Sequence, residues 1–212
     1  MDLERIREDF TQGQLGDNQV ADSPIDQFQA WFAEYELTRP KDLNAMVVST
    51  VDTEGKPQAR ILLLKELAED GFVFYTNYES NKGVEIENNP NVQLLFYWSV
   101  LERQVRVSGT VMKVTKQRSQ EYFKTRPYES QIGALASDQS RPISGRDKLE
   151  GKFKKHASAF PESEGVPMPE YWGGYVLDPT YFEFWQGRAS RLHDRITYTK
   201  EDGQWKVERI QP

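Results

Sequence analysis

The alternation of hydrophobic and polar positions divides the chain into a helical start, a long stretch of strands, a helical block and a second set of strands. Apolar residues at helical spacing begin the folded part: Ile25, Phe28, Phe32 and Tyr35. Ser23-Pro24 before them has the form of a helix start, with Ser as the cap and Pro in the first turn. The pattern therefore predicts one amphipathic helix that ends before Pro40.

From residue 45 the pattern changes to short apolar runs that are separated by turns. The runs that predict strands are 45–51, 58–65, 72–76, 92–98 and 104–114, and, after a helical block at 116–160 with breaks at Pro127 and Pro142, also 174–177, 181–186, 195–199 and 205–210. Short strands with tight turns favour a barrel or sandwich over a parallel sheet. We expect a mainly β fold with peripheral helices: one β-barrel domain over residues 23–212, preceded by a polar, mobile arm of residues 1–22 that contains a short helix.

The composition excludes several classes of chemistry. The 212 residues include no cysteine, so thiol nucleophiles, Cys-ligated zinc and iron–sulfur clusters are ruled out. Only His156 and His193 are present, so no zinc site with several histidines is available and no metal site is expected. A G-x-S-x-G nucleophile motif and both glycine-rich phosphate loops are missing as well. Hydrolase and metalloenzyme functions are therefore disfavoured.

The charge and hydropathy of the chain limit its partners. Lys and Arg number 27 against 33 Asp and Glu, which gives a net charge of −6, and such a chain is a poor general binder of nucleic acid or anionic membrane. The first ten residues are charged and contain no apolar leader, and the most apolar run, 92–101, is too short to span a bilayer. We expect a cytoplasmic protein with neither a nucleic-acid nor a membrane partner.

One basic and aromatic cluster lies in residues 182–195, FEFWQGRASRLHDR. If residues 191–195 are extended, alternation puts Arg191, His193 and Arg195 on one face and Leu192 and Asp194 on the other. Three potential cations on one face repel each other unless an anion lies among them. The alternative is a solvated edge strand.

Three further clusters have the residue types of phosphate sites. In residues 75–83, Ser80 is a helix cap and Lys82 lies in the first turn, where free backbone N–H groups favour an anion. Tyr122 and Arg126 share a helical face, with Ser130 after the break at Pro127, whereas Arg60 and Lys65 point to opposite faces of a regular strand. Each cluster alone has an ordinary surface explanation, but together they suggest ligands with more than one phosphate.

These motifs together resemble the pyridoxamine 5′-phosphate oxidase family. EFWQ, four residues and then RLHDR, at 183–195, resembles the C-terminal signature of that family, and other motifs follow the family in order: RILLLK at 60–65, FYTN at 74–77, IENNP at 86–90, LERQ at 101–104, SQIGA at 130–134 and WGG at 172–174. The resemblance covers the chain from about residue 25. In the arm, residues 7–10 (REDF) only weakly resemble a segment that covers bound substrate in relatives.

The resemblance implies a split β-barrel, specifically an FMN-binding split barrel, in a homodimer with two FMN sites at the subunit interface. It implies oxidation of pyridoxamine 5′-phosphate or pyridoxine 5′-phosphate to pyridoxal 5′-phosphate, with O2 reduced to H2O2. The implied FMN contacts are Arg60, Lys65, Tyr75, Thr76, Lys82, Gln104, Gln139, Ser140, Trp185 and Arg195. The implied substrate contacts are Lys65, Tyr122, Arg126, Ser130, Arg191, Leu192 and His193, of which Arg191 and His193 are the implied catalytic residues.

The chain departs from the family pattern at one position, and two other functions stay open. Where the family has Arg-Lys after the serine of the 75–83 segment, this chain has Asn81-Lys82, so one cation near the FMN phosphate is absent. One alternative function is a non-enzymatic split-barrel carrier of flavin or pyridoxal phosphate. The other is a flavin reductase or nicotinamide-dependent split-barrel enzyme, which would not need a second phosphate clamp of Tyr122, Arg126 and Ser130.

Overall fold

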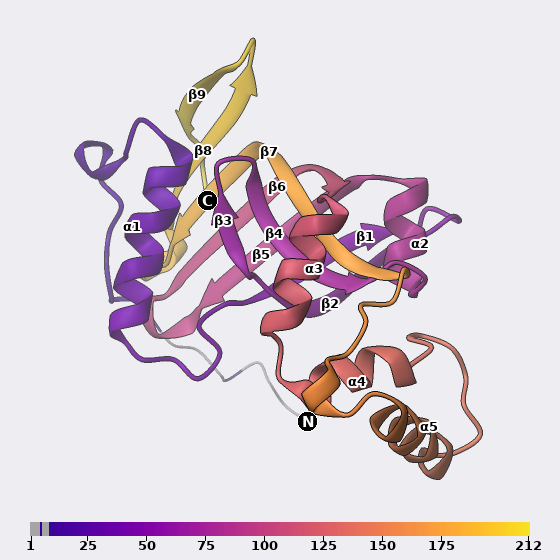
Figure 1. Ribbon diagram of the computed structural model, residues 1–212. Coiled ribbons are helices and arrows are strands. Elements are labelled where there is room, and N and C mark those ends of the chain that lie inside the picture. Colours follow the sequence, from indigo (N-terminus) through magenta and orange to yellow (C-terminus); the bar gives the residue numbers. More distant parts are fainter. Residues whose placement is uncertain (1–4, 6–8) are drawn as a thin grey trace.

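Nine antiparallel strands form one continuous sheet that curls into a half-barrel in the computed structural model, which describes residues 5 and 9–212 (Figure 1). The strands are β1 (Ala45–Val51), β2 (Pro57–Leu63), β3 (Glu66–Ala68), β4 (Gly71–Asn77), β5 (Asn91–Trp98), β6 (Arg103–Lys113), β7 (Trp172–Gln186), β8 (Asp194–Glu201) and β9 (Gln204–Arg209). Their order is β2-β1-β5-β6-β7-β4-β3, with β8 between β7 and β9. The prediction of a mainly β fold with peripheral helices is confirmed.

Five α-helices lie around this sheet in the described part of the chain. They are α1 (Pro24–Leu37), α2 (Asn81–Asn88), α3 (Lys116–Thr125), α4 (Tyr128–Ala136) and α5 (Arg146–Ala159), and four short 3-10 turns lie at Asp17–Gln19, Ser99–Leu101, Glu162–Glu164 and Ala189–Arg191. The predicted first helix is confirmed: Ser23 accepts a hydrogen bond from the Asp26 N–H, and Pro24 is the first helical residue. The predicted breaks also hold, because α3 ends before Pro127 and α5 begins only after Pro142.

Strand β7 is the longest element of the sheet and corrects the predicted strand pattern. The sequence predicts two strands, 174–177 and 181–186, but they form one strand of 15 residues. The register between β6 and β7 shifts between Ser108 and Gly109, where Gly109 pairs with Pro179. The shift accommodates a proline that cannot donate a backbone hydrogen bond, so the chain continues through it. A Cβ at Gly109 would lie 2.0 Å from the Asp178 carbonyl oxygen, so only glycine fits there.

The inner face of the half-barrel holds an aromatic core that α1 covers. Phe28 of α1 contacts Phe72 and Phe96, each at a ring-centroid distance of 5.0 Å. Trp31 packs edge-on against Phe184 at 5.3 Å. Burying a side chain of this size stabilises the fold by about 1.5–3 kcal/mol. The inner face of the sheet is therefore covered by α1 and not by a second sheet. The strand ends on either side of this core carry polar groups.

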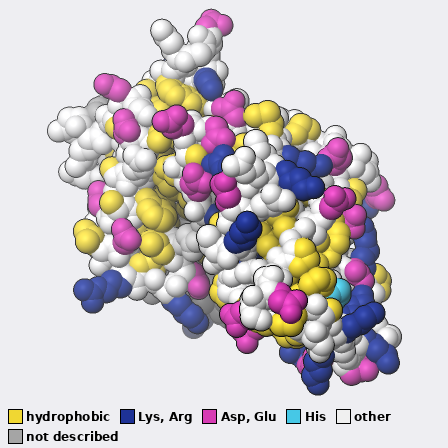
Figure 2. Space-filling model, in the orientation of Figure 1, with side chains coloured by type: hydrophobic (Ala, Val, Ile, Leu, Met, Phe, Trp, Pro, Cys, Tyr) yellow, Lys and Arg dark blue, Asp and Glu magenta, His cyan; other side chains and the backbone are white. Residues whose placement is uncertain are grey.

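The helical block lies at one end of the molecule. α5 packs mainly on α4, where the Tyr128 hydroxyl donates to the carbonyl oxygens of Ala157 and Phe160, at 3.2 and 2.9 Å. Figure 2 shows Lys and Arg side chains gathered where α5 lies, among carboxylates spread over the rest of that face. The whole block connects β6 to β7, so it lies beside the end of the sheet where β7 begins (Figure 1).

The described part of the arm packs on the domain. Leu15 is only 2% exposed; its N–H donates to Asp194, and Arg209 donates to its carbonyl oxygen. The Tyr198 hydroxyl donates to the carbonyl oxygen of Ala21 at 2.7 Å. The short helix expected in the arm is the single 3-10 turn Asp17–Gln19. Between residues 15 and 21 the arm thus lies against strands β8 and β9.

None of the helices that the structure describes has both the length and the apolar character needed to cross a membrane.

The fold predicts that Gly83→Ala destabilises the protein. Gly83 lies on the buried face of α2, and a Cβ there would lie 1.9 Å from the Tyr78 carbonyl oxygen. Because the clash is with backbone, the helix must move, and we expect a loss of about 1–3 kcal/mol in the free energy of unfolding measured with denaturant.

Gly151→Ala in α5 is the matched control. Its added Cβ meets nothing within 4 Å, so a helical glycine is replaced without a clash and stability should stay equal or rise by up to about 1 kcal/mol. Equal effects of the two substitutions would contradict the packing of α2 on Tyr78.

Candidate functional site

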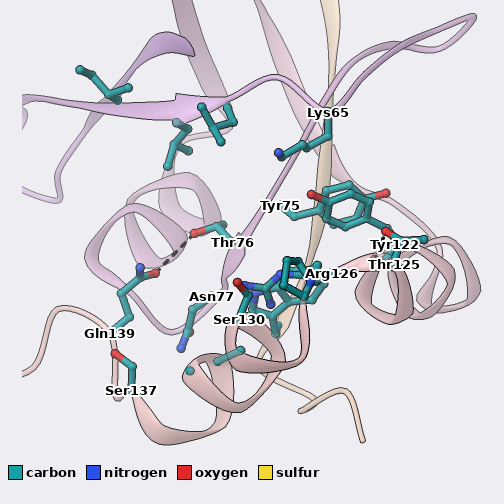
Figure 3. Close-up of a pocket in the computed structure, with 17 residues that line it drawn as sticks. Lys65, Tyr75, Thr76, Asn77, Tyr122, Thr125, Arg126, Ser130, Ser137 and Gln139 are labelled. Carbon is teal, nitrogen blue, oxygen red and sulfur yellow. Dashed lines mark hydrogen bonds between the residues drawn. The ribbon is translucent and has the colours of Figure 1, made fainter. Parts of the chain in front are cut away.

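A cavity of about 780 Å³ opens between the ends of β2 and β4 and helices α3 and α4 (Figure 3). Seven of the predicted site residues line it: Lys65, Tyr75, Thr76, Tyr122, Arg126, Ser130 and Gln139. In Figure 3, Lys65 and Gln139 lie on different sides of the cavity, and Arg126 and Ser130 lie below Lys65 in this view. Residues that are up to 74 positions apart in the sequence thus meet in one place, as their shared ligand chemistry predicted.

Three aromatic rings form one wall of this cavity. Tyr75 and Tyr122 stack with centroids 3.9 Å apart, and Trp172 lies nearly parallel to Tyr75 at 5.5 Å. Arg126 lies over the Trp172 ring at 4.8 Å. Aromatic faces attract a guanidinium, so the stack holds Arg126 in place just before the N-terminus of α4.

The guanidinium of Arg126 is not fully hydrogen-bonded. One of its terminal nitrogens, Nη1, is buried and has no hydrogen-bond partner among the described residues. Burial lowers the pKa of Arg126 from its ordinary value. A buried donor that is left unpaired costs about 1–3 kcal/mol. An anion in the cavity would accept from this nitrogen and remove that cost.

Lys82 is a second buried cation next to the same cavity. It is 7% exposed, and its Nζ donates to Ser80 Oγ and to Gln139 Oε1, each at 3.1 Å. Burial and the neighbouring Arg60 lower its pKa to about 8, although Glu85 opposes them. Lys82 makes no ion pair with a carboxylate of the described chain. It lies in the first turn of α2, where the free backbone N–H groups also favour an anion.

The other predicted residues near α2 have different surroundings. Arg60 does not line the cavity; it lies on the other face of its strand from Ile61 and pairs with Glu85 at 2.8 Å. Lys65 lies two residues beyond the end of β2 and is exposed at the cavity, so the strand alternation expected for Arg60 and Lys65 does not extend to Lys65. Ser140 follows Gln139 in an exposed loop with φ of 70°, and Asn81 is the exposed first residue of α2.

A second set of predicted residues lies at the far end of the sheet. Gln104, Trp185 and Arg195 are direct partners in the registers of β6, β7 and β8, so they form one row across the three strands. The Arg195 guanidinium donates to the buried carboxylate of Glu183 at 2.9 and 2.8 Å, and Arg106 donates to the other oxygen of that carboxylate. Arg195 of this row is therefore held in place by a charge network.

The segment around Arg191 corrects an expectation. Residues 191–195 are not extended: Ala189–Arg191 form a 3-10 turn in which Ser190 and Arg191 have φ of 56° and 61°. Strand β8 begins only at Asp194, so strand alternation does not govern Arg191 and His193. The turn leaves Arg191 and Leu192 exposed, and Leu192 is 71% exposed.

His193 packs between two aromatic rings beside this turn. Its ring lies 4.6 Å from that of Trp185 and 5.5 Å from that of Phe10. The Arg188 N–H donates to its Nδ1 at 3.1 Å, so the neutral ring carries its proton on Nε2. Burial and then the charge of Arg191 lower the pKa of His193, which keeps the ring neutral at pH 7. His193 therefore presents a hydrogen-bond donor.

The structure thus separates the predicted residues, apart from Arg60 and Ser140, into two groups. The cavity group is Lys65, Tyr75, Thr76, Lys82, Tyr122, Arg126, Ser130 and Gln139, and the sheet-end group is Gln104, Trp185, Arg191, Leu192, His193 and Arg195. Trp172 of the cavity and Trp185 of the sheet end lie thirteen residues apart on β7. At about 3.3 Å per residue, that is roughly 40 Å along the strand. The two groups therefore lie toward opposite ends of this strand.

Sequence reasoning missed several residues of the two groups. Trp172 and Asn77 line the cavity. They belong to the motifs WGG and FYTN, but neither of these two residues has a role predicted from the sequence. Ser137 and Thr125 carried no signal, since small polar residues at helix ends are common. Phe10 packs edge-on against Trp185 at 5.6 Å; it ends the REDF segment, of which Arg7 and Glu8 lie outside the described residues.

Comparison with known families supports the resemblance. A model described as pyridoxamine 5′-phosphate oxidase matches residues 34–158, more than half of the chain. A second model, described as the pyridoxine 5′-phosphate oxidase C-terminal dimerisation region, matches residues 172–212. The cavity group falls within the first match, apart from the wall residue Trp172, and most of the sheet-end group falls within the second.

Curated relatives match over the full length of the chain. Proteins named pyridoxine/pyridoxamine 5′-phosphate oxidase are 48% identical in Leptospira interrogans, covering 99% of this chain and 98% of the relative, and 49% identical in Cupriavidus pinatubonensis, covering 99% of both. A third, from Janthinobacterium sp., is 46% identical and covers 100% of both chains.

Solved structures agree on the fold. The crystal structure of PhzG from Burkholderia lata 383, in complex with tetrahydrophenazine-1-carboxylic acid, superposes with a TM-score of 0.86 at 24% identity, covering 92% of this chain and 95% of that one. A pyridoxamine 5′-phosphate oxidase-related, FMN binding protein from Nostoc punctiforme gives a TM-score of 0.71 at 18% identity, covering 91% and 100%. These superpositions confirm the predicted split β-barrel. Together with the family model and the full-length relatives, they establish that this chain belongs to the pyridoxamine 5′-phosphate oxidase family.

Proposed function

We propose that this chain oxidises pyridoxamine 5′-phosphate and pyridoxine 5′-phosphate to pyridoxal 5′-phosphate, with FMN as cofactor and O2 as the oxidant that becomes H2O2. One observation carries the proposal most directly: two buried cations, Lys82 and Arg126, adjoin one cavity without a carboxylate partner in the described chain. Two phosphorylated ligands, a flavin nucleotide and a vitamer, would satisfy both. The full-length relatives named for this reaction support it.

The residues around α2 fit the phosphate of FMN. Lys82 supplies an ammonium, the first turn of α2 supplies backbone N–H groups, and Arg60 adds a guanidinium from below the helix. Thr76 and Gln139, which already bond to one another at 3.5 Å, add hydroxyl and amide groups toward the cavity. When bound, FMN supplies the redox chemistry, since it accepts a hydride equivalent from C4′ of the vitamer and passes it to O2.

The residues of α3 and α4 fit the phosphate of the vitamer. Arg126 offers its unpaired nitrogen, Tyr122 and Ser130 offer hydroxyls, and Lys65 adds a cation from the facing wall. Binding energy from this remote group holds the pyridine ring in place for the reaction at C4′. For the amine substrate, loss of two electrons at C4′ leaves an imine, which water hydrolyses to the aldehyde with release of ammonia.

We place the sheet-end group of a second copy against the cavity group of the first, in a homodimer with FMN at the interface. Four apolar side chains exposed on the sheet and the turns beside it would be covered there: Ile61 at 70%, Tyr97 at 61%, Val100 at 55% and Leu192 at 71% exposure. A twofold axis forms two equal sites, each with one group from each copy. The match of residues 172–212 to a dimerisation region supports this assembly.

Within that arrangement Arg191 and His193 orient the vitamer. His193 donates from Nε2, because its Nδ1 already accepts from the Arg188 N–H. Arg191 lies exposed at the tip of its turn and adds a cation beside it. Trp185 and Gln104 would contact the flavin, as would Arg195, which Glu183 holds in place.

The two alternative functions are less well supported. A flavin reductase would leave the cluster of Tyr122, Arg126 and Ser130 without a ligand, yet these three residues line one cavity. A non-enzymatic carrier would not need the Arg191 and His193 pair, and the activity assay below separates the two. We further propose a cytoplasmic location, based on the acidic and cysteine-free composition.

The proposal predicts a flavin that the substrate reduces. Purified protein reconstituted with FMN should show the visible flavin absorption bands, and pyridoxamine 5′-phosphate added without oxygen should bleach them. Admitting O2 should restore the bands and yield pyridoxal 5′-phosphate and H2O2. Unphosphorylated pyridoxamine is the control and should bleach the bands far more slowly, because it leaves Arg126 unpaired. A flavin band that stays unchanged with the phosphorylated substrate would support the carrier function instead.

Lys82 gives FMN affinity a predicted pH dependence. Its pKa is about 8 in the free protein, and a bound phosphate stabilises the ammonium and so raises that pKa. Binding therefore takes up a proton above about pH 8, and FMN affinity should fall there by up to about tenfold per pH unit, while it is fully retained well below pH 8. Quenching of flavin fluorescence measures the affinity. Lys82→Gln should bind FMN more weakly at neutral pH and lose the slope; an unchanged slope would assign it to another group.

A further inference from the structure

A buried carboxylate, Glu85, lies under the first turns of α2 and belongs to neither group of predicted site residues. It is 7% exposed and faces the sheet from the buried side of the helix. One of its oxygens, Oε2, accepts from the Arg60 guanidinium at 2.8 Å and from the Thr50 hydroxyl at 2.5 Å. Arg60 also donates to the Thr50 oxygen at 2.5 Å, so the three side chains form a closed triangle.

The triangle joins three elements that surround the proposed phosphate site. Thr50 comes from β1, Arg60 from β2 and Glu85 from α2, one helical turn after Lys82. The second bond of Arg60 Nη1, to the Val48 carbonyl oxygen, is longer, at 3.3 Å. Glu85 is therefore the only carboxylate among the described residues that holds this guanidinium.

The two neighbouring cations, Arg60 and Lys82, favour a negative charge between them. Arg60 and Lys82 are both largely buried and repel each other, as the lowered pKa of Lys82 reflects. Glu85 faces both from α2, while Ser80 and Gln139, which contact Lys82 from the cap and from the loop after α4, are neutral. One carboxylate between two cations leaves a net positive charge, which a phosphate can still use.

We propose that Glu85 is a positioning residue for the FMN phosphate: it fixes Arg60 beneath α2 and keeps two cations together at one anion site. This inference rests on the proposed function, in which α2 and Arg60 bind that phosphate. Glu85 does not touch the cofactor; it acts through Arg60 and Lys82. A buried carboxylate that merely stabilised the fold would affect all flavins equally, whereas a positioning role affects only those with a phosphate.

The test compares FMN with riboflavin, which has no phosphate, in Glu85→Gln. We expect FMN to bind roughly tenfold more weakly, because Gln keeps the shape but loses the charge that orders Arg60. Riboflavin affinity should stay within about twofold of that of the unchanged protein. Glu87→Gln is the matched control: Glu87 lies on the same helix but is exposed and pairs with Lys113, so it should alter neither affinity.

Two further measurements show whether Glu85 acts through the cations. In a double-mutant cycle, Glu85→Gln should add little loss of FMN affinity once Arg60→Gln is present. The pH above which FMN affinity falls should also shift below about 8, because Glu85 opposes the burial and the Arg60 charge that lower the pKa of Lys82. Thr50→Val, which keeps both charges and removes the bridging hydroxyl, should show a smaller loss in the same direction and serves if Glu85→Gln does not fold.

The outcomes separate this inference from the proposed function. If the unchanged protein binds FMN and riboflavin equally, the phosphate site itself is wrong. If it prefers FMN but Glu85→Gln and Thr50→Val keep that preference and the same pH profile, Glu85 has no positioning role. Parallel losses for FMN and riboflavin would likewise assign Glu85 to the fold alone.

Discussion

The length of β7 is the constraint on which the site depends. Its first residue, Trp172, stacks in the wall of the cavity, and near its end Trp185 packs against His193, with twelve residues between the two tryptophans. Along the strand β4 and β8 pair with its two halves, so the strand is rigid throughout. A strand of this length holds the cavity group and the sheet-end group apart, and in the dimer that we propose a ligand that contacts both groups lies between two copies of the chain.

Within the cavity group, two buried cations have no carboxylate partner among the described residues, which costs stability. Lys82 and Arg126 lose hydration without gaining an ion pair in the described chain, and burial lowers the pKa of both. The aromatic core beneath α1 and the three-ring stack beside Arg126 supply the packing that makes this tolerable. By contrast Arg60 and Arg195 are each paired with a buried glutamate, Glu85 and Glu183, which fixes them in place before any ligand binds.

Local signals in the sequence predicted the elements well. The Ser23-Pro24 start, the Ser80 cap and the break at Pro127 are all found where short-range rules place them, because each depends on a few neighbouring residues. The continuity of β7 through Pro179 escaped prediction, since a glycine seventy residues earlier accommodates it. The positive φ of Ser190 and Arg191 escaped as well, because neither residue type requires it. The tertiary structure decides which of the site residues meet within one chain. The spacing of residues in the sequence therefore did not reveal the two groups.

A mixed dimer tests the central claim, that each site combines the cavity group of one copy with the sheet-end group of the other. Two chains with different affinity tags, one carrying Arg126→Ala and the other Arg191→Ala, are co-expressed and the mixed dimer is isolated. Each variant alone should be nearly inactive in pyridoxine 5′-phosphate oxidation. In the mixed dimer one site collects both substitutions and the other none, so we expect about half of the activity of the unchanged dimer. A mixed dimer as inactive as its parents would show that both arginines serve a site within one chain.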